Sequence, residues 1–183
     1  DEPLVNLDYK LREALVLELK TLLAETGATV IYTSTDPRDA FALGDQVMLL
    51  HEQCRVQAGT PLALYREPIS LAAAHLMSDP GVNLLPGANR DSDKGCLAIR
   101  PEHVLLPGEA DQTFADAKVF DMQVDSVERS GDETFVHGRV ISNDKTTNEQ
   151  HWVVRRPGMH SVSVGEMLAL RLRGEDILNL ALN

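Results

Sequence analysis

The sequence is poor in aromatic residues, cysteines and basic residues, and each shortage narrows the possible functions. Aromatic residues make up 4% of the 183 residues, so Leu, Val, Ile and Ala must fill any core. The two cysteines, Cys54 and Cys96, show no pairing motif, which favours a reducing compartment. The 17 basic residues face 28 acidic residues, and the resulting net charge of -11 repels phosphate backbones. We therefore expect no nucleic-acid partner.

Long apolar runs are also absent from the sequence. No run approaches the roughly 18 residues that a membrane-spanning helix needs, and no signal peptide is visible. We therefore expect no direct membrane insertion. The composition favours a cytoplasmic protein that works at a membrane, if it does so, through a partner.

The first third of the chain alternates between helical and strand patterns. Apolar residues recur at helical spacing over residues 7–26. The apolar, β-branched runs at 28–33 and 45–51 are typical of buried strands. Between these runs, Asp36 and Pro37 are a typical N-cap and first residue of a short helix. Strand, helix and strand at this spacing predict parallel pairing in an α/β layer.

The pattern changes near residue 78. After a hairpin or edge strand at 52–61 and two short helices, Gly, Pro and Asn separate many short alternating strands. These predicted strands occupy residues 82–87, 96–101, 103–107, 114–130, 133–141, 150–156, 166–173 and 177–182. Such a series predicts a small barrel. We therefore expect two domains, at residues 1–78 and 79–183.

The chain begins with two adjacent carboxylates, Asp1 and Glu2, followed by Pro3. In an ATPase, successive acids at the end of a buried strand have separate roles. The first holds Mg²⁺, usually through water, and the second orients or deprotonates the attacking water. A Pro after them turns the chain away from the strand end, where α/β folds bind ligands. The tripeptide alone also suits a solvated loop, so the wider sequence has to decide between the two interpretations.

The segments DEPLVNLD (1–8) and TVIYTSTDPRDAFALGDQVMLLHEQCRVQAGTPLALYREP (29–68) resemble the C-terminal half of an ABC-transporter nucleotide-binding subunit. ISLAAAHLMSDPGVNLLPG, AIRPEHVLL and VDSVERSGDETFVHGRV resemble the transport-associated OB (TOBE-like) region that follows it in carbohydrate-importer ATPases. The resemblance covers essentially the whole chain. It implies an α/β remnant of a P-loop ATPase, with parallel strands and helices, followed by a β-rich OB-like barrel domain.

The resemblance also implies roles for individual residues. Asp1 would assist Mg²⁺ through water, and Glu2 would be the general base. Asp8, with Asn6 and Leu7, would form the D-loop at the dimer interface, although Asn6 also suits a helix N-cap. The sequence has no G-x-x-x-x-G-K-[ST] phosphate loop and no LSGGQ-type signature. We therefore expect an inactive fragment without bound nucleotide, whose full-length parent uses ATP and Mg²⁺.

One position departs from the family pattern, which is approximately V-I-Y-V-T-H-D. Here the stretch is VIYTSTD, so Thr35 occupies the position of the His that contacts the γ-phosphate in the family. A Thr hydroxyl is shorter than an imidazole and carries no charge near neutral pH. Either the parent pairs with a second ATPase subunit that keeps its His, or Thr35 is a tolerated or engineered change, or Thr35 simply caps the next helix. We predict that the parent alone hydrolyses ATP poorly and that Thr35→His raises the rate.

The resemblance implies an energy-coupling subunit of an ABC importer for a carbohydrate or polyol. Its partners would be a second ATPase subunit, in a homodimer or heterodimer, and membrane permease subunits that hold it at the inner face of the cell membrane. The alternative is a regulatory and dimerisation module that binds a small effector or an inhibitory protein without catalysis.

Several other polar and aromatic residues have less specific patterns. His51 and Cys54 could form a metal-ligand pair, but nothing complementary follows at zinc-site spacing. We expect Cys96 to be a small buried apolar residue. We expect the charged residues of IRPEH (99–103) to form a structural salt bridge, and the sole Trp, Trp152, to be half-buried in the core rather than exposed for stacking.

Overall fold

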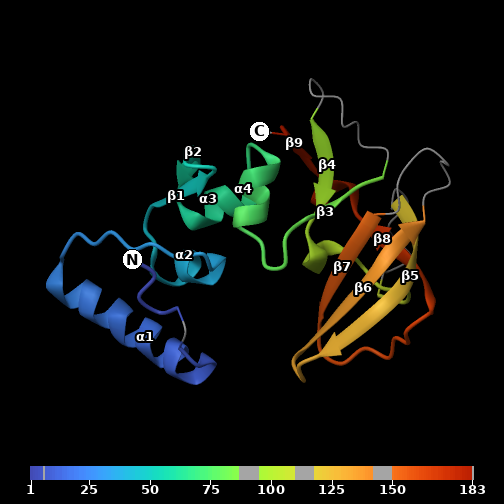
Figure 1. Ribbon diagram of the computed structural model, residues 1–183, viewed down its shortest axis with the longest axis horizontal. Coiled ribbons are helices and arrows are strands. Elements are labelled where there is room, and N and C mark those ends of the chain that lie inside the picture. The colour runs from blue at the N-terminus through green and yellow to red at the C-terminus, as the bar shows by residue number, and fades with distance from the viewer. Residues whose placement is uncertain (6, 87–94, 110–117, 142–149, 183) are drawn as a thin grey trace. The chain divides into compact units, whose positions relative to one another are not determined.

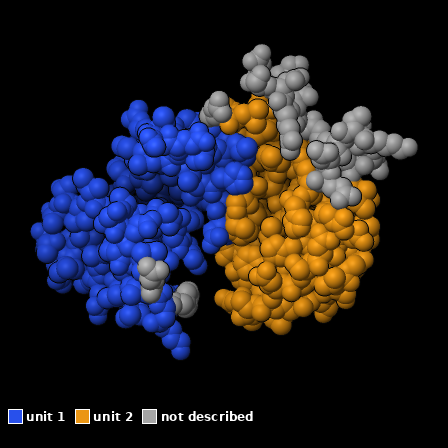
Figure 2. Space-filling model, viewed as in Figure 1, with its two compact units in different colours: residues 1–79 blue, residues 80–183 orange. Residues whose placement is uncertain are grey.

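The structure, a computed structural model, divides the chain into two compact units, unit 1 at Asp1–Asp79 and unit 2 at Pro80–Asn183 (Figure 2). The described residues are 1–5, 7–86, 95–109, 118–141 and 150–182. The division follows Asp79, whereas the sequence placed a boundary after residue 78. Each unit has its own cluster of buried apolar side chains.

Unit 1 contains four helices and a β-hairpin among its described residues (Figure 1). They are α1 Tyr9–Thr26, α2 Pro37–Leu43, β1 Val47–His51, β2 Cys54–Gly59, α3 Pro61–Arg66 and α4 Leu71–Leu76. The side chain of Asp8 caps α1 by accepting a hydrogen bond from the Leu11 N–H at 3.0 Å. The predicted N-cap Asn6 lies outside the described residues. No helix in the described part of the chain is both long enough and apolar enough to span a bilayer.

Residues 28–33, predicted as a buried strand, form no strand, and the predicted parallel pairing with residues 45–51 is wrong. β1 pairs instead with β2 in an antiparallel hairpin. A strand needs neighbours for its backbone N–H and C=O groups. The backbone contact shown for this segment is the hydrogen bond from Glu2 N to Thr33 O at 3.2 Å, and Ile31 is 93% exposed. The identity of unit 1 as an ATPase remnant therefore stays a prediction.

The hairpin packs against α3 and α4 through a small core. The buried apolar side chains of this core are Leu49, Leu64, Ala73 and Met77. The turn between β1 and β2 places Glu52 at φ 47° and Gln53 at φ 63°. Residues other than Gly, Asn and Asp seldom adopt this left-handed backbone conformation, and Asn-Gly is a usual sequence of a two-residue hairpin turn. The turn is therefore a strained point of unit 1.

Unit 2 is β-rich, as the sequence predicts for this part of the chain. Its elements are β3 Asn83–Leu84, β4 Cys96–Ile99, η1 Pro101–His103, β5 Lys118–Arg129, β6 Glu133–Ile141, β7 Gln150–Pro157, β8 Met167–Leu172, η2 Gly174–Asp176 and β9 Leu178–Leu180. One antiparallel sheet has the strand order β7-β6-β5-β8, and a second has the order β3-β4-β9 (Figure 1). This two-sheet architecture is consistent with the predicted OB-like domain.

The two sheets of unit 2 share one apolar core. Alternate residues of β6 and β8 are buried, as expected for strands that turn one face toward a core. Trp152, predicted to be half-buried, is 0% exposed. Its indole can be fully buried because Nε1 donates a hydrogen bond to the backbone oxygen of Leu84 at 2.7 Å. The predicted burial of Cys96 is confirmed, and burial raises the pKa of its thiol.

The predicted strand at 103–107 is the other departure from the expected pattern. Pro101–His103 forms the 3-10 turn η1, and Leu105 makes an isolated bridge to Arg171 in β8. Pro101 fixes φ and has no N–H to donate, so it suits the start of a turn better than a ladder. The two hydrogen bonds of the bridge, each 3.0 Å, connect the segment after η1 to the four-stranded sheet.

Candidate functional site

A small hollow in unit 1 brings together two of the residues to which the sequence assigns catalytic roles, Glu2 and Thr35. The hollow has a volume of about 40 Å³. Its lining residues are Glu2, Val5, Arg12, Tyr32, Ser34, Thr35, Asp36 and Asp39. They come from the start of the chain, from α1, from the segment that precedes α2 and from α2 itself. Asp8, the predicted D-loop residue, is not part of this lining and caps α1 instead.

The first two residues are bonded to Thr33, Asp1 through its carboxylate and Glu2 through its backbone N–H. The backbone N–H of Glu2 donates to the backbone oxygen of Thr33 at 3.2 Å and to its Oγ1 at 3.0 Å. Thr33 Oγ1 in turn donates a hydrogen bond to Asp1 Oδ1. Glu2 lies at φ 42°, in the left-handed region. These contacts fix the position of the acid pair relative to the segment that carries Thr35.

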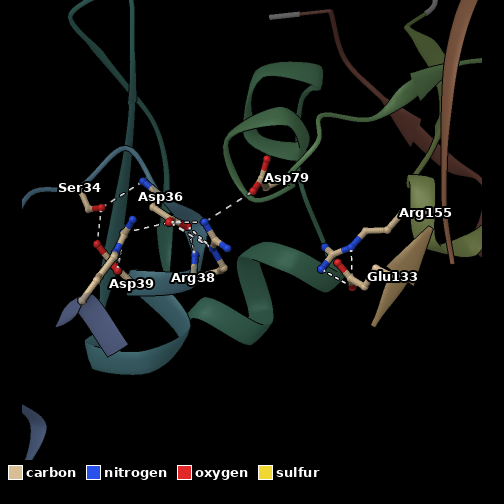
Figure 3. Close-up of polar contacts among 8 residues, drawn as sticks. Ser34, Asp36, Arg38, Asp39, Asp79, Glu133 and Arg155 are labelled. Atoms are coloured by element: carbon tan, nitrogen blue, oxygen red, sulfur yellow. Dashed lines mark hydrogen bonds and ion pairs between the residues drawn. The ribbon is translucent and has the colours of Figure 1, made fainter. Parts of the chain in front are cut away.

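Asp39 in α2 is buried beside the hollow and accepts hydrogen bonds from three side chains, of which Ser34 is labelled in Figure 3. Arg12 Nη2 of α1 donates at 2.9 Å, Tyr32 Oη at 2.9 Å and Ser34 Oγ at 2.6 Å. Burial raises the pKa of Tyr32 to about 12, and the hydrogen bond to Asp39 acts in the same direction. The hydrogen bond to Asp39 also raises the pKa of the Arg12 guanidinium, against the opposing effect of burial.

Asp36 is the N-cap of α2, as the sequence predicts, and the alternative that Thr35 caps this helix is wrong. Asp36 Oδ1 accepts from the backbone N–H of Arg38 at 2.9 Å, and Pro37 follows at the first helical position. Two guanidinium groups also reach Asp36: Nη2 of Arg38, labelled in Figure 3, and Nη2 of Arg12 each lie 2.8 Å from Asp36 Oδ2. Burial acts to raise the pKa of Asp36, but the hydrogen bonds from Arg38 and the two positive charges outweigh it and lower the pKa.

The hollow suits a few ordered waters rather than a nucleotide. One water needs about 10–15 Å³ of accessible space, so a space of about 40 Å³ is far too small for a triphosphate. Carboxylate oxygens of Asp1 and Glu2 are of the kind that Mg²⁺ prefers. In the described part of the chain, however, no group of three or more His, Cys, Asp or Glu side chains is arranged to hold a metal ion. The phosphate-binding elements of an ATPase site are also absent from the sequence.

The sequence did not single out Arg12, Tyr32, Ser34 or Asp39. Asp39 and Arg12 are 27 residues apart, so their contact depends on how α2 lies against α1.

The other residues that the sequence singled out lie outside the hollow. Cys54 is exposed at the start of β2 and is a free thiol. The predicted salt bridge in the 99–103 stretch stays a prediction. His103 Nδ1 lies 3.5 Å from Asp176 Oδ1 of η2, a contact that is ionic only when the imidazole is protonated. Arg100 of the same stretch is buried.

Comparisons with known proteins extend over both units. Residues 97–180 match the TOBE domain. The chain is 33% identical over 194 residues to the sn-glycerol-3-phosphate import ATP-binding protein UgpC 3 of Agrobacterium fabrum, covering 96% of this chain and 52% of that protein. It is also 33% identical over 202 residues to the xylose/arabinose import ATP-binding protein XacK of Haloferax volcanii, covering 98% of this chain and 51% of that protein. UgpC of Rhodopseudomonas palustris (strain HaA2) is 31% identical over 184 residues, with coverages of 91% and 50%.

The chain therefore spans about half the length of the curated relatives that it matches. It contains a TOBE domain and is homologous to the C-terminal part of ABC importer ATP-binding subunits, so the predicted resemblance is confirmed.

Proposed function

We propose that this homologue of importer ATP-binding subunits forms the C-terminal part of such a subunit, which couples ATP hydrolysis to the uptake of a sugar, a polyol or glycerol phosphate. The observation that carries the proposal is the extent of the homology. It runs through 96% of the chain, and so includes unit 1 with the hollow as well as the TOBE domain of unit 2.

The arrangement of the hollow supports specific roles for its residues. Glu2 would accept a proton from the attacking water, and Asp1 would hold Mg²⁺ through a water molecule. Mg²⁺ neutralises charge on the phosphates when it is bound. Glu2 and Thr35 line one hollow, and Asp1 and Glu2 are both tied to Thr33. This proximity is what a general base and a γ-phosphate-contacting position require, because both must act on one phosphate and one water.

The proposal also covers partners and location. The subunit pairs with a second ATPase subunit, which keeps its own His at the position of Thr35 if the dimer is a heterodimer. Asp8 at the start of α1 would lie at that dimer interface. Permease subunits hold the assembly at the cytoplasmic face of the membrane and, with an external binding protein, select the solute. By itself the 183-residue chain neither binds nor hydrolyses ATP, because it has no phosphate loop.

The alternative is a regulatory and dimerisation module that binds a small effector or an inhibitory protein. The TOBE match to residues 97–180 and the separate core of unit 2 favour it, because they describe a domain that carries its own stability. In that case the acids of unit 1 have no catalytic task.

The deciding experiment uses the longer polypeptide that contains this chain together with the residues N-terminal to Asp1. We expect Mg²⁺-dependent ATP hydrolysis by this polypeptide, and a loss of about 10²-fold or more for Glu2→Gln, as for removal of a general base. Glu25→Gln, at an exposed position near the end of α1, is the matched control and should keep the wild-type rate. Equal rates for Glu2→Gln and the control would refute the assigned role of Glu2. Absence of hydrolysis in the wild-type polypeptide would support the regulatory module instead.

A further inference from the structure

Asp39 connects three parts of unit 1. Among the described residues of this unit, it is the one charged side chain that is buried, at 4% exposure. Its carboxylate receives Arg12 from α1, and Tyr32 and Ser34 from the segment before α2. Because a buried carboxylate must keep its partners, this arrangement resists displacement of any of the three.

The contacts of Asp39 hold the two residues that flank Thr35 in the sequence, Ser34 directly and Asp36 through Ser34. Ser34 Oγ donates to Asp39 and accepts the backbone N–H of Asp36 at 3.0 Å (Figure 3). Asp36 is fixed in turn by its capping bond to α2 and by Arg12. Thr33, between Tyr32 and Ser34, bonds instead to the acid pair at residues 1–2. Within segment 32–36, Thr33 is therefore bonded to the acid pair, and the residues on either side of it, Tyr32 and Ser34, are bonded to Asp39.

The same contacts lead back to the start of α1. The backbone N–H of Arg12 donates to the backbone oxygen of Asp8 at 2.9 Å, in the first turn of the helix. A displacement of Asp8 would therefore move Arg12, and Arg12 is bonded to both Asp39 and Asp36. Asp8 is linked in this way to the segment that carries Thr35.

We propose that Asp39, together with Arg12, is a positioning residue for the hydrolysis reaction proposed above: it holds segment 32–36 so that Thr35 stays in the hollow that Glu2 also lines, and it couples this geometry to the position of α1. This inference rests on the proposed function. Asp39 does not act on the substrate itself, and its effect passes through Ser34, Asp36 and the backbone of Thr35.

A role in stability alone would predict a different result. If the ion pair served stability alone, its removal would lower the fraction of folded protein, and the rate would fall in proportion. The rate per folded molecule would then be unchanged. A positioning role lowers kcat of the folded protein and leaves the KM for ATP nearly unchanged, because Asp39 would act through segment 32–36 and not through nucleotide binding.

The test compares variants of the longer ATP-hydrolysing polypeptide. We expect Asp39→Asn to lower kcat about 10-fold to 100-fold with KM within about twofold, the loss typical of a slight misplacement of reacting groups. Asp39→Glu keeps the charge and should restore most of the rate. Asp125→Asn is the matched control, because it breaks the Asp125–Arg139 pair of unit 2 at 3.1 Å and should leave kcat unchanged. Should Asp39→Asn fail to fold, Tyr32→Phe and Ser34→Ala each remove one donor without a change of charge, and each should lower kcat.

A second measurement uses the 183-residue chain and needs no ATP hydrolysis. We expect amide hydrogen exchange at residues 32–36 to be faster in Asp39→Asn than in the wild type, and unchanged in Asp125→Asn. The inference is overturned if the wild-type polypeptide hydrolyses ATP and Asp39→Asn keeps its kcat, or if exchange at 32–36 is the same in both chains. If the wild-type polypeptide does not hydrolyse ATP, the proposed function fails first, and the inference fails with it.

Discussion

Truncation of Asn83 should measurably weaken unit 2, because its side chain joins the two sheets. Asn83 of β3 is 4% exposed. Its Nδ2 donates to the backbone oxygen of Val153 in β7 at 2.8 Å, and its Oδ1 accepts the backbone N–H of the same residue at 2.9 Å. Asn83→Ala would leave both backbone groups without these partners, at about 1–3 kcal/mol for each group that stays unsatisfied. We expect a loss of about 3 kcal/mol in the free energy of unfolding.

Urea unfolding followed by tryptophan fluorescence tests this expectation directly. The sole Trp, Trp152, lies next to Val153 and reports on unit 2 alone. With a slope of about 1.5 kcal/mol per M, a loss of about 3 kcal/mol lowers the urea midpoint by about 2 M. Asn179→Ala in β9, where the side chain is exposed, is the matched control and should change stability by less than about 0.5 kcal/mol. A loss below about 1 kcal/mol for Asn83→Ala would show that the two bonds do not hold the sheets together.

Three further predictions concern unit 1. Tyr32 should ionise near pH 12, so the stability from its protonated phenol is complete below about pH 10 and is lost as pH rises through about 12. Tyrosinate absorbance should show a lower midpoint in Asp39→Asn, and an unchanged midpoint would contradict the assigned contact. Replacing Glu52 by Asn and Gln53 by Gly should stabilise unit 1 by about 1 kcal/mol, because both residues have positive φ. Thermal unfolding followed by circular dichroism measures this gain. An unchanged or lower Tm would count against strain in the turn. Thr35→His in the longer polypeptide should raise ATP hydrolysis, whereas equal turnover would remove Thr35 as the cause of slow hydrolysis.

Local sequence patterns predicted the helices of unit 1 and most strands of unit 2. The cap at Asp36 with Pro37 and the alternation in β6 depend on neighbours in sequence and on one buried face, so the pattern contains the necessary information. The apolar segment 28–33 shows where this information ends. Its composition is that of a buried strand, but its conformation depends on partners for its backbone, and Ile31 lies exposed in this structure.

The sequence named two residues that line the hollow but none of the residues that hold them in place. The family pattern pointed to Glu2 and Thr35, which line one hollow, and their catalytic roles stay predictions. Asp39 had no such signal, because an acid near the N-terminus of a helix is usually explained by the helix dipole and exposure to solvent. Its burial depends on Arg12, which comes from a helix 27 residues earlier and supplies the charge that makes a buried carboxylate tolerable.

The contrast between the two units has a physical consequence for the site. Unit 2 has a large buried apolar cluster, whereas the cluster described for unit 1 consists of four buried residues, from the hairpin, α3, α4 and the C-cap of α4. None of these four lies in the segment 32–36, so this cluster does not fix Thr35 by direct packing. That task falls to the hydrogen bonds and ion pairs of Asp39 and Asp36, which are directional and fail together when one charge is removed. The geometry of the hollow should therefore respond more sharply to the loss of one carboxylate than to the loss of an apolar side chain in the hairpin core.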